Sequence, residues 1–163
     1  MATITLVRVD YRLIHGQVIT QWCKQANADK IIIINDELAN DPFLSSVYTM
    51  AAPPSVKVKI YNMEKALEKW KKNEFGSGKV MIMYRSVIDA RNSYFQGVTY
   101  PNLNVGGVAA EPGKKSVLGQ VNLSMDEYEF IRELHQEGVS VNAQVLPNEP
   151  KLDFDDLTKK MKG

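Results

Sequence analysis

The segment that decides the fold is ITLVRV at residues 4–9, which is followed by the polar loop DYRLIHGQ at residues 10–17. An apolar run that is rich in β-branched residues and closed by polar residues is typical of a buried β-strand. Runs of the same kind recur along the chain, and we predict a strand in each of them: residues 4–9, 30–34, 56–60, 80–83 and 139–145. A shorter run at residues 103–105 is interpreted in the same way.

Segments with helical spacing separate these strands. Apolar residues recur three and four positions apart within residues 18–26, 43–50 and 63–70. Asp41 can cap the second of these helices, which would begin at Pro42 and stop at Pro53. Three more helices are predicted from capping residues and end signals: Ser86 to Gly97, Ser124 with Glu127 to Gly138, and residues 153–160.

This alternation of strands and helices predicts the α/β class. Parallel strands need helical connections that cover the sheet, so we expect a single open, mainly parallel β-sheet with helices on both faces. The length of 163 residues fits one domain of ordinary size. We therefore expect residues 1–163 to form a single domain.

The composition excludes several classes of function. Twenty basic and 19 acidic residues leave a formal net charge of +1, so the whole chain offers no electrostatic case for binding nucleic acid. Cys23 is the only cysteine and cannot form an internal disulfide. The first residues lack a signal-peptide pattern, and the apolar run at residues 31–34 is far shorter than the roughly 20 residues that span a bilayer. We expect a cytoplasmic protein, and any contact with a membrane would be through a partner.

The chemistry should lie beyond the carboxyl ends of the strands, where open parallel sheets bind ligands. Four loops are expected there, at residues 8–17, 35–37, 84–86 and 106–107, and the last is expected to be a tight turn with close backbone approach to the site. In the loop after the first strand, His15 precedes Gly16 and a predicted helix, so free N–H groups of the first turn could bind an anion carried by the imidazole. Arg12 would add a forked cation, and Asp10 could hold the other ring nitrogen or Arg12. Phosphoryl transfer needs chiefly alignment and neutralised oxygens, so these residues predict a phosphohistidine at His15.

Three alternatives stand beside this prediction. His15 could be an ordinary surface residue next to a solvated ion pair of Asp10 and Arg12. A histidine phosphatase would share the His-Gly pair, but Ile14 stands where that superfamily needs an arginine. A regulatory domain could keep the fold and leave His15 unmodified.

Residues 8–18, RVDYRLIHGQV, closely resemble the active-site signature of the enzyme IIB proteins of the mannose, fructose and sorbose class of bacterial phosphotransferase systems. The resemblance covers essentially the whole chain. It extends through residues 34–36, 51–54 with Val58, 81–86 and 103–107.

The resemblance implies that a phosphohistidine on a IIA domain donates the phosphoryl group to His15, and that the group passes to a sugar arriving through the membrane subunits IIC and IID. It maps Arg12 and Asp10 onto the arginine and aspartate of the family's loop and suggests Nδ1 as the phosphorylated nitrogen. Two histidines and one cysteine at unrelated positions form no recognisable metal-ligand cluster, so we expect no metal, and we expect no cofactor. The sugar and any homo-oligomer are left undetermined. The remaining residues are assigned as phosphate-binding or site-lining: Gly16, Gln17, Asp36, Arg85, Ser86, Gly106 and Gly107.

Two departures from the family pattern bear on the charge of the site. Many relatives carry a basic residue shortly after the Gly-Gly pair, whereas this chain has Glu111, with Lys114 or Lys115 as substitutes. Arg85 could bring a positive charge to the rim instead. Three other signals are interpreted as structural: the glycine-rich residues 76–79 as a turn, Cys23 as a packed side chain and His135 as a surface residue.

Overall fold

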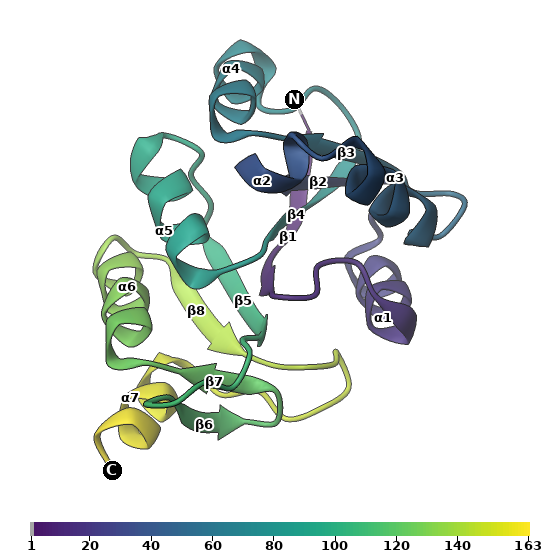
Figure 1. Cartoon of the computed structure of the whole chain (residues 1–163). Helices are drawn as coiled ribbons and strands as arrows, with labels where there is room; N and C mark the ends of the chain where they lie inside the picture. The colour runs from purple at the N-terminus through teal and green to yellow at the C-terminus, as the bar shows by residue number, and fades with distance from the viewer. Residues whose placement is uncertain (1) are drawn as a thin grey trace.

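A six-stranded sheet forms the centre of the molecule (Figure 1). The computed structural model describes residues 2–163, and of Gln17 it describes the backbone alone. The strands follow the order β3-β2-β4-β1-β5-β8, and every neighbouring pair is parallel. Their bounds are Thr3–Asp10 for β1, Lys30–Ile34 for β2, Lys57–Tyr61 for β3, Lys79–Tyr84 for β4, Asn102–Gly107 for β5 and Ser140–Ala143 for β8. The predicted α/β class with a mainly parallel sheet is confirmed.

Helices cover both faces of this sheet. They are α1 (Gly16–Ala26), α2 (Asp36–Ala39), α3 (Pro42–Ala51), α4 (Met63–Asn73), α5 (Val87–Gln96), α6 (Met125–Gln136) and α7 (Phe154–Lys162). Successive strand residues point to opposite faces, so Ile31 and Ile33 belong to the hydrophobic cluster that includes side chains of α1, whereas Ile32 and Ile34 belong to the cluster that includes side chains of α4 to α7. Each face therefore has its own hydrophobic cluster.

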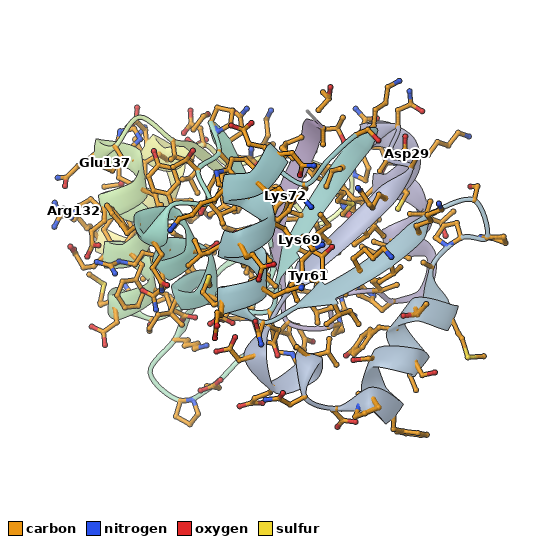
Figure 2. All side chains as sticks on the ribbon, turned by 90° about the horizontal axis from the view of Figure 1, so that it is seen from above. Asp29, Tyr61, Lys69, Lys72, Arg132 and Glu137 are labelled. Carbon is orange, nitrogen blue, oxygen red and sulfur yellow. The ribbon has the colours of Figure 1, made fainter. Side chains whose placement is uncertain are left out.

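The helix ends follow the predicted capping chemistry. The Asp41 carboxylate accepts a hydrogen bond from the Leu44 N–H at 3.0 Å, and α3 begins at the proline after Asp41. Ser124 and Glu127 form the reciprocal capping box that was predicted for α6. Figure 2 shows Asp29, which precedes β2, at the end of the sheet opposite α2 and α3, which follow β2. Helices α2 and α3 therefore begin at the carboxyl edge of the sheet.

Two local predictions were wrong, and one element was missed. Gly106 and Gly107 were expected in a loop, but they are the last residues of β5, and Gly107 pairs with Asp10 of β1. Residues 35–37 were expected as a loop, but Asn35 caps the short helix α2 through a 2.8 Å bond from the Leu38 N–H. The sequence also gave no signal for a two-stranded antiparallel hairpin, which comprises β6 (Lys115–Leu118) and β7 (Val121–Leu123).

Helix α3 differs from the other long helices because none of its residues is buried. Its ten residues include no charged side chain. Phe43 is 75% exposed and Met50 82%, and Leu44 and Val47 are also exposed. The helix lies over β3, an edge strand of the sheet.

The structure also bears on membrane insertion. Over residues 2–163, every helix is too short or too polar to cross a bilayer.

Candidate functional site

The loop after β1 lies where the chain changes from one face of the sheet to the other. Strand β1 leads into α1 on one face, whereas its neighbours β4 and β5 lead toward α5 and α6 on the opposite face. Connections that diverge in this way leave a crevice at the carboxyl ends of the strands, which is the usual ligand position in open α/β sheets. Asp10 is the last residue of β1, and residues 11–15 form the loop.

The loop takes a tight, partly left-handed path. The Leu13 N–H donates to the Asp10 carbonyl at 2.9 Å, and Leu13 has a positive φ of 54°. That conformation costs a non-glycine residue roughly 1–2 kcal/mol. Burial of the Leu13 and Ile14 side chains in the cluster beneath α1 offsets this cost. Gly16 also has a positive φ, 46°, and a Cβ there would meet no atom within 4 Å, so open space borders the start of α1.

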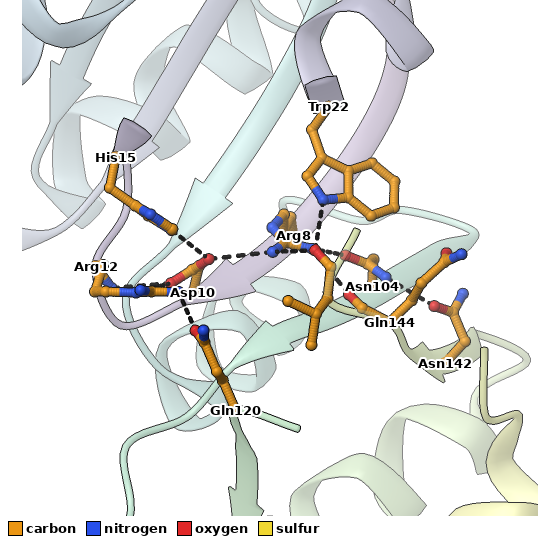
Figure 3. A network of polar contacts seen from close by, with 10 residues as sticks. Arg8, Asp10, Arg12, His15, Trp22, Asn104, Gln120, Asn142 and Gln144 are labelled. Atoms are coloured by element: carbon orange, nitrogen blue, oxygen red, sulfur yellow. Dashed lines mark hydrogen bonds and ion pairs between the residues drawn. The ribbon is translucent and has the colours of Figure 1, made fainter. Parts of the chain in front are cut away.

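Asp10 is the centre of the polar contacts in Figure 3. Its Oδ2 lies 3.0 Å from the Nε2 of His15 and 3.1 Å from the Nη2 of Arg8. Its Oδ1 accepts from the backbone N–H of Arg12 at 3.0 Å. An ionised carboxylate can only accept, so the proton of a neutral His15 ring is on Nε2. The lone pair is then on Nδ1, the nitrogen that Asp10 does not contact.

Arg8 forms a hydrogen bond with Asp10 and is itself almost completely buried. Its Nη1 donates to the Asn104 side chain and to the Gln144 carbonyl, and its Nη2 donates to Asp10 and to the Val145 carbonyl. Burial lowers the pKa of Arg8 to about 10, against the opposing effect of Asp10. The guanidinium is therefore still charged at neutral pH and forms a buried ion pair with Asp10 at 3.1 Å.

The Gly-Gly pair makes room for these two buried side chains. A Cβ on Gly106 would lie 2.0 Å from the Arg8 guanidinium, and a Cβ on Gly107 would lie 2.7 Å from Asp10 Oδ1. Both positions therefore need glycine because of close packing, although the predicted turn is absent. We call Arg8, Asp10, Arg12 and His15 the histidine network.

Arg12 is the most exposed cation of the histidine network, at 32%. Its Nη2 donates to the Gln120 side chain, and its guanidinium lies 5.3 Å from the centre of the Tyr11 ring. Its Nε lies 3.8 Å from Asp10 Oδ1, too far for a hydrogen bond, and it has no partner within the described part of the chain. Sequence reasoning missed Gln120 because it lies 108 residues from Arg12, in the turn of the unpredicted hairpin.

Three of the predicted site residues lie elsewhere. Asp36, Arg85 and Ser86 line a separate cavity of about 350 Å³, together with Glu37 and Asp89. Burial raises the pKa of the Asp89 carboxyl, and the charges of Asp36 and Glu37 raise it further, while Ser86 and Arg85 oppose the shift. We call this site the acidic cavity. It lies between the ends of β2 and β4, which again lead to opposite faces of the sheet.

The two lysines that were candidates for a missing positive charge are both engaged outside the histidine network. Lys114 Nζ pairs with Glu127 at 3.3 Å and with Glu111 at 3.5 Å. Lys115 Nζ donates to the Met161 carbonyl at 2.9 Å. Arg8 and Arg12 therefore supply the guanidinium charges next to Asp10.

Cys23, His135 and the glycine-rich residues 76–79 were each interpreted as structural, and their surroundings agree with this interpretation. Cys23 is buried, and burial raises the pKa of its thiol to about 11. His135 is exposed and stacks on Phe154, with 3.9 Å between the ring centres. Residues 76–78 lead into β4, whose first residue is Lys79. Gln17 lies in the first turn of α1, and its side chain is outside the described part of the structure.

Comparison with known proteins gives one consistent result. Residues 4–163 match the family described as the PTS system sorbose subfamily IIB component. The chain is 38% identical to the PTS system sorbose-specific EIIB component of Klebsiella pneumoniae, covering 93% of this chain and 92% of that protein. It is 32% identical to the PTS system mannose-specific EIIAB component of Escherichia coli (strain K12), covering 97% of this chain and 49% of that protein. The crystal structure of manxB from Thermoanaerobacter tengcongensis is similar, with a TM-score of 0.92 and 38% identity over 98% of this chain and 97% of that one.

Proposed function

Since the chain belongs to the sorbose subfamily of phosphotransferase-system IIB components, we propose that His15 is the residue on which it carries its phosphoryl group. Members of the family are phosphocarriers in sugar uptake, and the chain is accordingly a phosphotransferase. Membership favours the carrier over the phosphatase alternative. The position of Ile14 agrees, because it packs in the core where a phosphatase would need an arginine.

The partners follow from membership of the family. IIB components work with a IIA donor and with the membrane subunits IIC and IID, and the mannose-specific relative is an EIIAB protein. In our proposal, residues 1–163 act as one IIB domain in the cytoplasm and meet the membrane through IIC and IID. His15 receives its phosphoryl group from a phosphohistidine of IIA and delivers it to a sugar that IIC and IID bring in.

The contact between Asp10 and the Nε2 of His15 carries the assignment of the reacting nitrogen. In the transfer, the lone pair of Nδ1 forms a new N–P bond while the N–P bond to the donor imidazole breaks and its electron pair returns to the donor ring. The proton on Nε2 stays there, hydrogen-bonded to Asp10. The carboxylate stabilises the positive charge that the ring gains, and it fixes the orientation of the ring.

Stabilisation of the phosphoryl oxygens is assigned to Arg12 and to the first turn of α1. The first N–H groups of any helix lack acceptors within the helix, and the helix dipole favours an anion at that end. His15 is the N-cap residue of α1, and its side chain makes no capping bond, so the ring is free to hold an anion there. The open space beside Gly16 gives the oxygens room.

The proposal is tested by intact mass spectrometry after incubation with phosphoenolpyruvate, enzyme I, HPr and a matching IIA protein. The wild-type chain should gain one acid-labile phosphate, His15→Ala should gain none, and His135→Ala, the matched control at the other histidine, should behave as wild type. Phosphate that persists on a folded His15→Ala variant would overturn the assignment. Phosphorus–nitrogen couplings in the NMR spectrum of the phosphorylated chain then distinguish Nδ1 from Nε2.

A further inference from the structure

Gln120 occupies a defined position next to the histidine network. It lies in the two-residue turn between β6 and β7, and its backbone carbonyl accepts from the Val108 N–H at 3.0 Å. The Asn122 N–H donates to the Val108 carbonyl at 3.2 Å, and Val121 is fully buried. The backbone of Gln120 is therefore fixed to the end of β5.

The end of β5 is also an anchor of the histidine loop. The Tyr11 N–H donates to the Gly107 carbonyl at 3.0 Å, directly before Val108. The hairpin turn and the histidine loop are thus attached to adjacent residues, Val108 and Gly107, at the end of β5. As Figure 3 shows, Gln120 approaches Arg12 from the hairpin, on the side of the guanidinium away from His15.

Arg12 is held at several points but keeps an unused donor. Its backbone N–H is bound to Asp10, its Nη2 to Gln120, and its guanidinium lies against the Tyr11 ring. The Nε–H makes no hydrogen bond among the described residues although it is shielded from solvent, and it lies 3.8 Å from Asp10 Oδ1. A shielded N–H without an acceptor is unfavourable, so an anion oxygen that reached it would be bound with a gain in free energy.

We propose that Gln120 is a positioning residue for phosphoryl transfer, which holds the Arg12 guanidinium in place before the phosphoryl group reaches His15. This role rests on the proposed function of His15. Because an arginine side chain otherwise samples many rotamers, fixing it in advance removes an ordering cost from the transfer step. Gln120 itself contacts neither the phosphoryl group nor His15.

The chemistry of the amide suits this role. The neutral Oε1 accepts a hydrogen bond from Arg12 without cancelling its charge, so the full guanidinium charge is available to the phosphoryl oxygens. A carboxylate at the same position would also bind Arg12, but it would neutralise the cation and repel the incoming anion. The Gln120→Glu variant should therefore still hold the Arg12 side chain but neutralise its charge, so it tests the two effects separately.

The test is the single-turnover rate of phosphoryl transfer from labelled phospho-IIA, measured against donor concentration. We expect Gln120→Ala to lower the maximal rate about tenfold and to leave the half-saturating donor concentration within about twofold, because the donor still docks. Gln120→Glu should be at least as slow. Ser116→Ala, an exposed position on the same hairpin, is the matched control and should transfer at the wild-type rate.

The double variant Arg12→Ala/Gln120→Ala distinguishes positioning from a general effect on the fold. If Gln120 acts through Arg12, the double variant should be no slower than Arg12→Ala, whereas independent effects would multiply. A wild-type rate for Gln120→Ala, or multiplied losses, would overturn the role of Gln120 and leave the function of His15 intact. A wild-type chain that accepts no phosphate would overturn both. Far-ultraviolet circular dichroism of each variant excludes misfolding as the cause.

Discussion

The histidine network and the acidic cavity occupy equivalent places in the fold and have opposite charge. Each lies at the carboxyl edge of the sheet, between strands whose connections leave to different faces. In the histidine network, two guanidinium groups and an imidazole surround one carboxylate. In the acidic cavity, one guanidinium faces three carboxylates. Topology thus offers two sites, and local charge favours the histidine network for a phosphoryl group.

The largest difference between the two sites is expected when one arginine is removed from each. Arg12→Ala should slow phosphoryl transfer to His15 by about 10²–10³-fold, the usual loss when one donor to a developing anion is removed. Arg85→Ala should stay within about twofold of wild type, because Arg85 lines the other cavity. Single-turnover rates measure both. Equal losses would mean that the two sites act on the same phosphoryl group.

The close packing around Arg8 in the histidine network is tested at Gly106. Gly106→Ala should reduce the free energy of unfolding by about 3–5 kcal/mol, because the added methyl would displace the Arg8 guanidinium from Asp10 and break a buried ion pair. Gly138→Ala is the control. It meets no atom within 4 Å and should cost only the strain of its positive φ, roughly 1–2 kcal/mol. Urea denaturation measures both, and similar losses would contradict the packing argument.

Asp89 in the acidic cavity should make the free energy of unfolding depend on pH. Burial raises the pKa of Asp89 in the folded state, so the folded chain binds more protons there than the unfolded chain at mildly acidic pH. Stability therefore falls as pH rises from the ordinary carboxyl range through the raised pKa of Asp89. Asp89→Asn should remove this fall and be more stable than wild type at neutral pH. Urea denaturation at several pH values tests this, with the exposed Glu68→Gln as control.

The smallest effect is expected at Cys23, which lies outside both sites. Its thiol pKa of about 11 leaves almost no thiolate at neutral pH, so Cys23→Ser should accept phosphate as wild type does. Iodoacetamide should alkylate the native chain slowly and the urea-unfolded chain rapidly. Fast alkylation of the native chain would show that the thiol is accessible and would reopen a chemical role for it.

Local sequence was sufficient for most of the fold, and long-range pairing explains what was missed. The main strands and the capped helices are each encoded within about ten residues, by periodicity and capping side chains. Strands β6 and β7 have only four and three residues, too few for a recognisable alternation. Their pairing depends on the turn at Gly119 and Gln120 and on contact with β5.

In the candidate site, too, the residues that are close in sequence were predicted correctly and the distant ones were not. Asp10, Arg12 and His15 lie within six consecutive residues, so one loop brings them together. Asp36 was assigned to the same site because it also follows a strand, but β4 separates its strand from β1. Arg85 follows the strand next to β1, yet its connection turns to the opposite face. The sequence is enough to predict which residues lie at the carboxyl edge of the sheet. It is not enough to predict which of those residues lie together in one site.

The uncharged, exposed helix α3 determines how the purified protein should behave in concentrated salt. Phe43 and Met50 present apolar surface without a neighbouring charge on the helix to keep it hydrated. Strongly hydrated salts such as ammonium sulfate increase the tendency of such surface to leave water. The chain should therefore adsorb to a phenyl matrix at a modest salt concentration. The exposed apolar residues of α3 should also lower the salt concentration at which the chain precipitates.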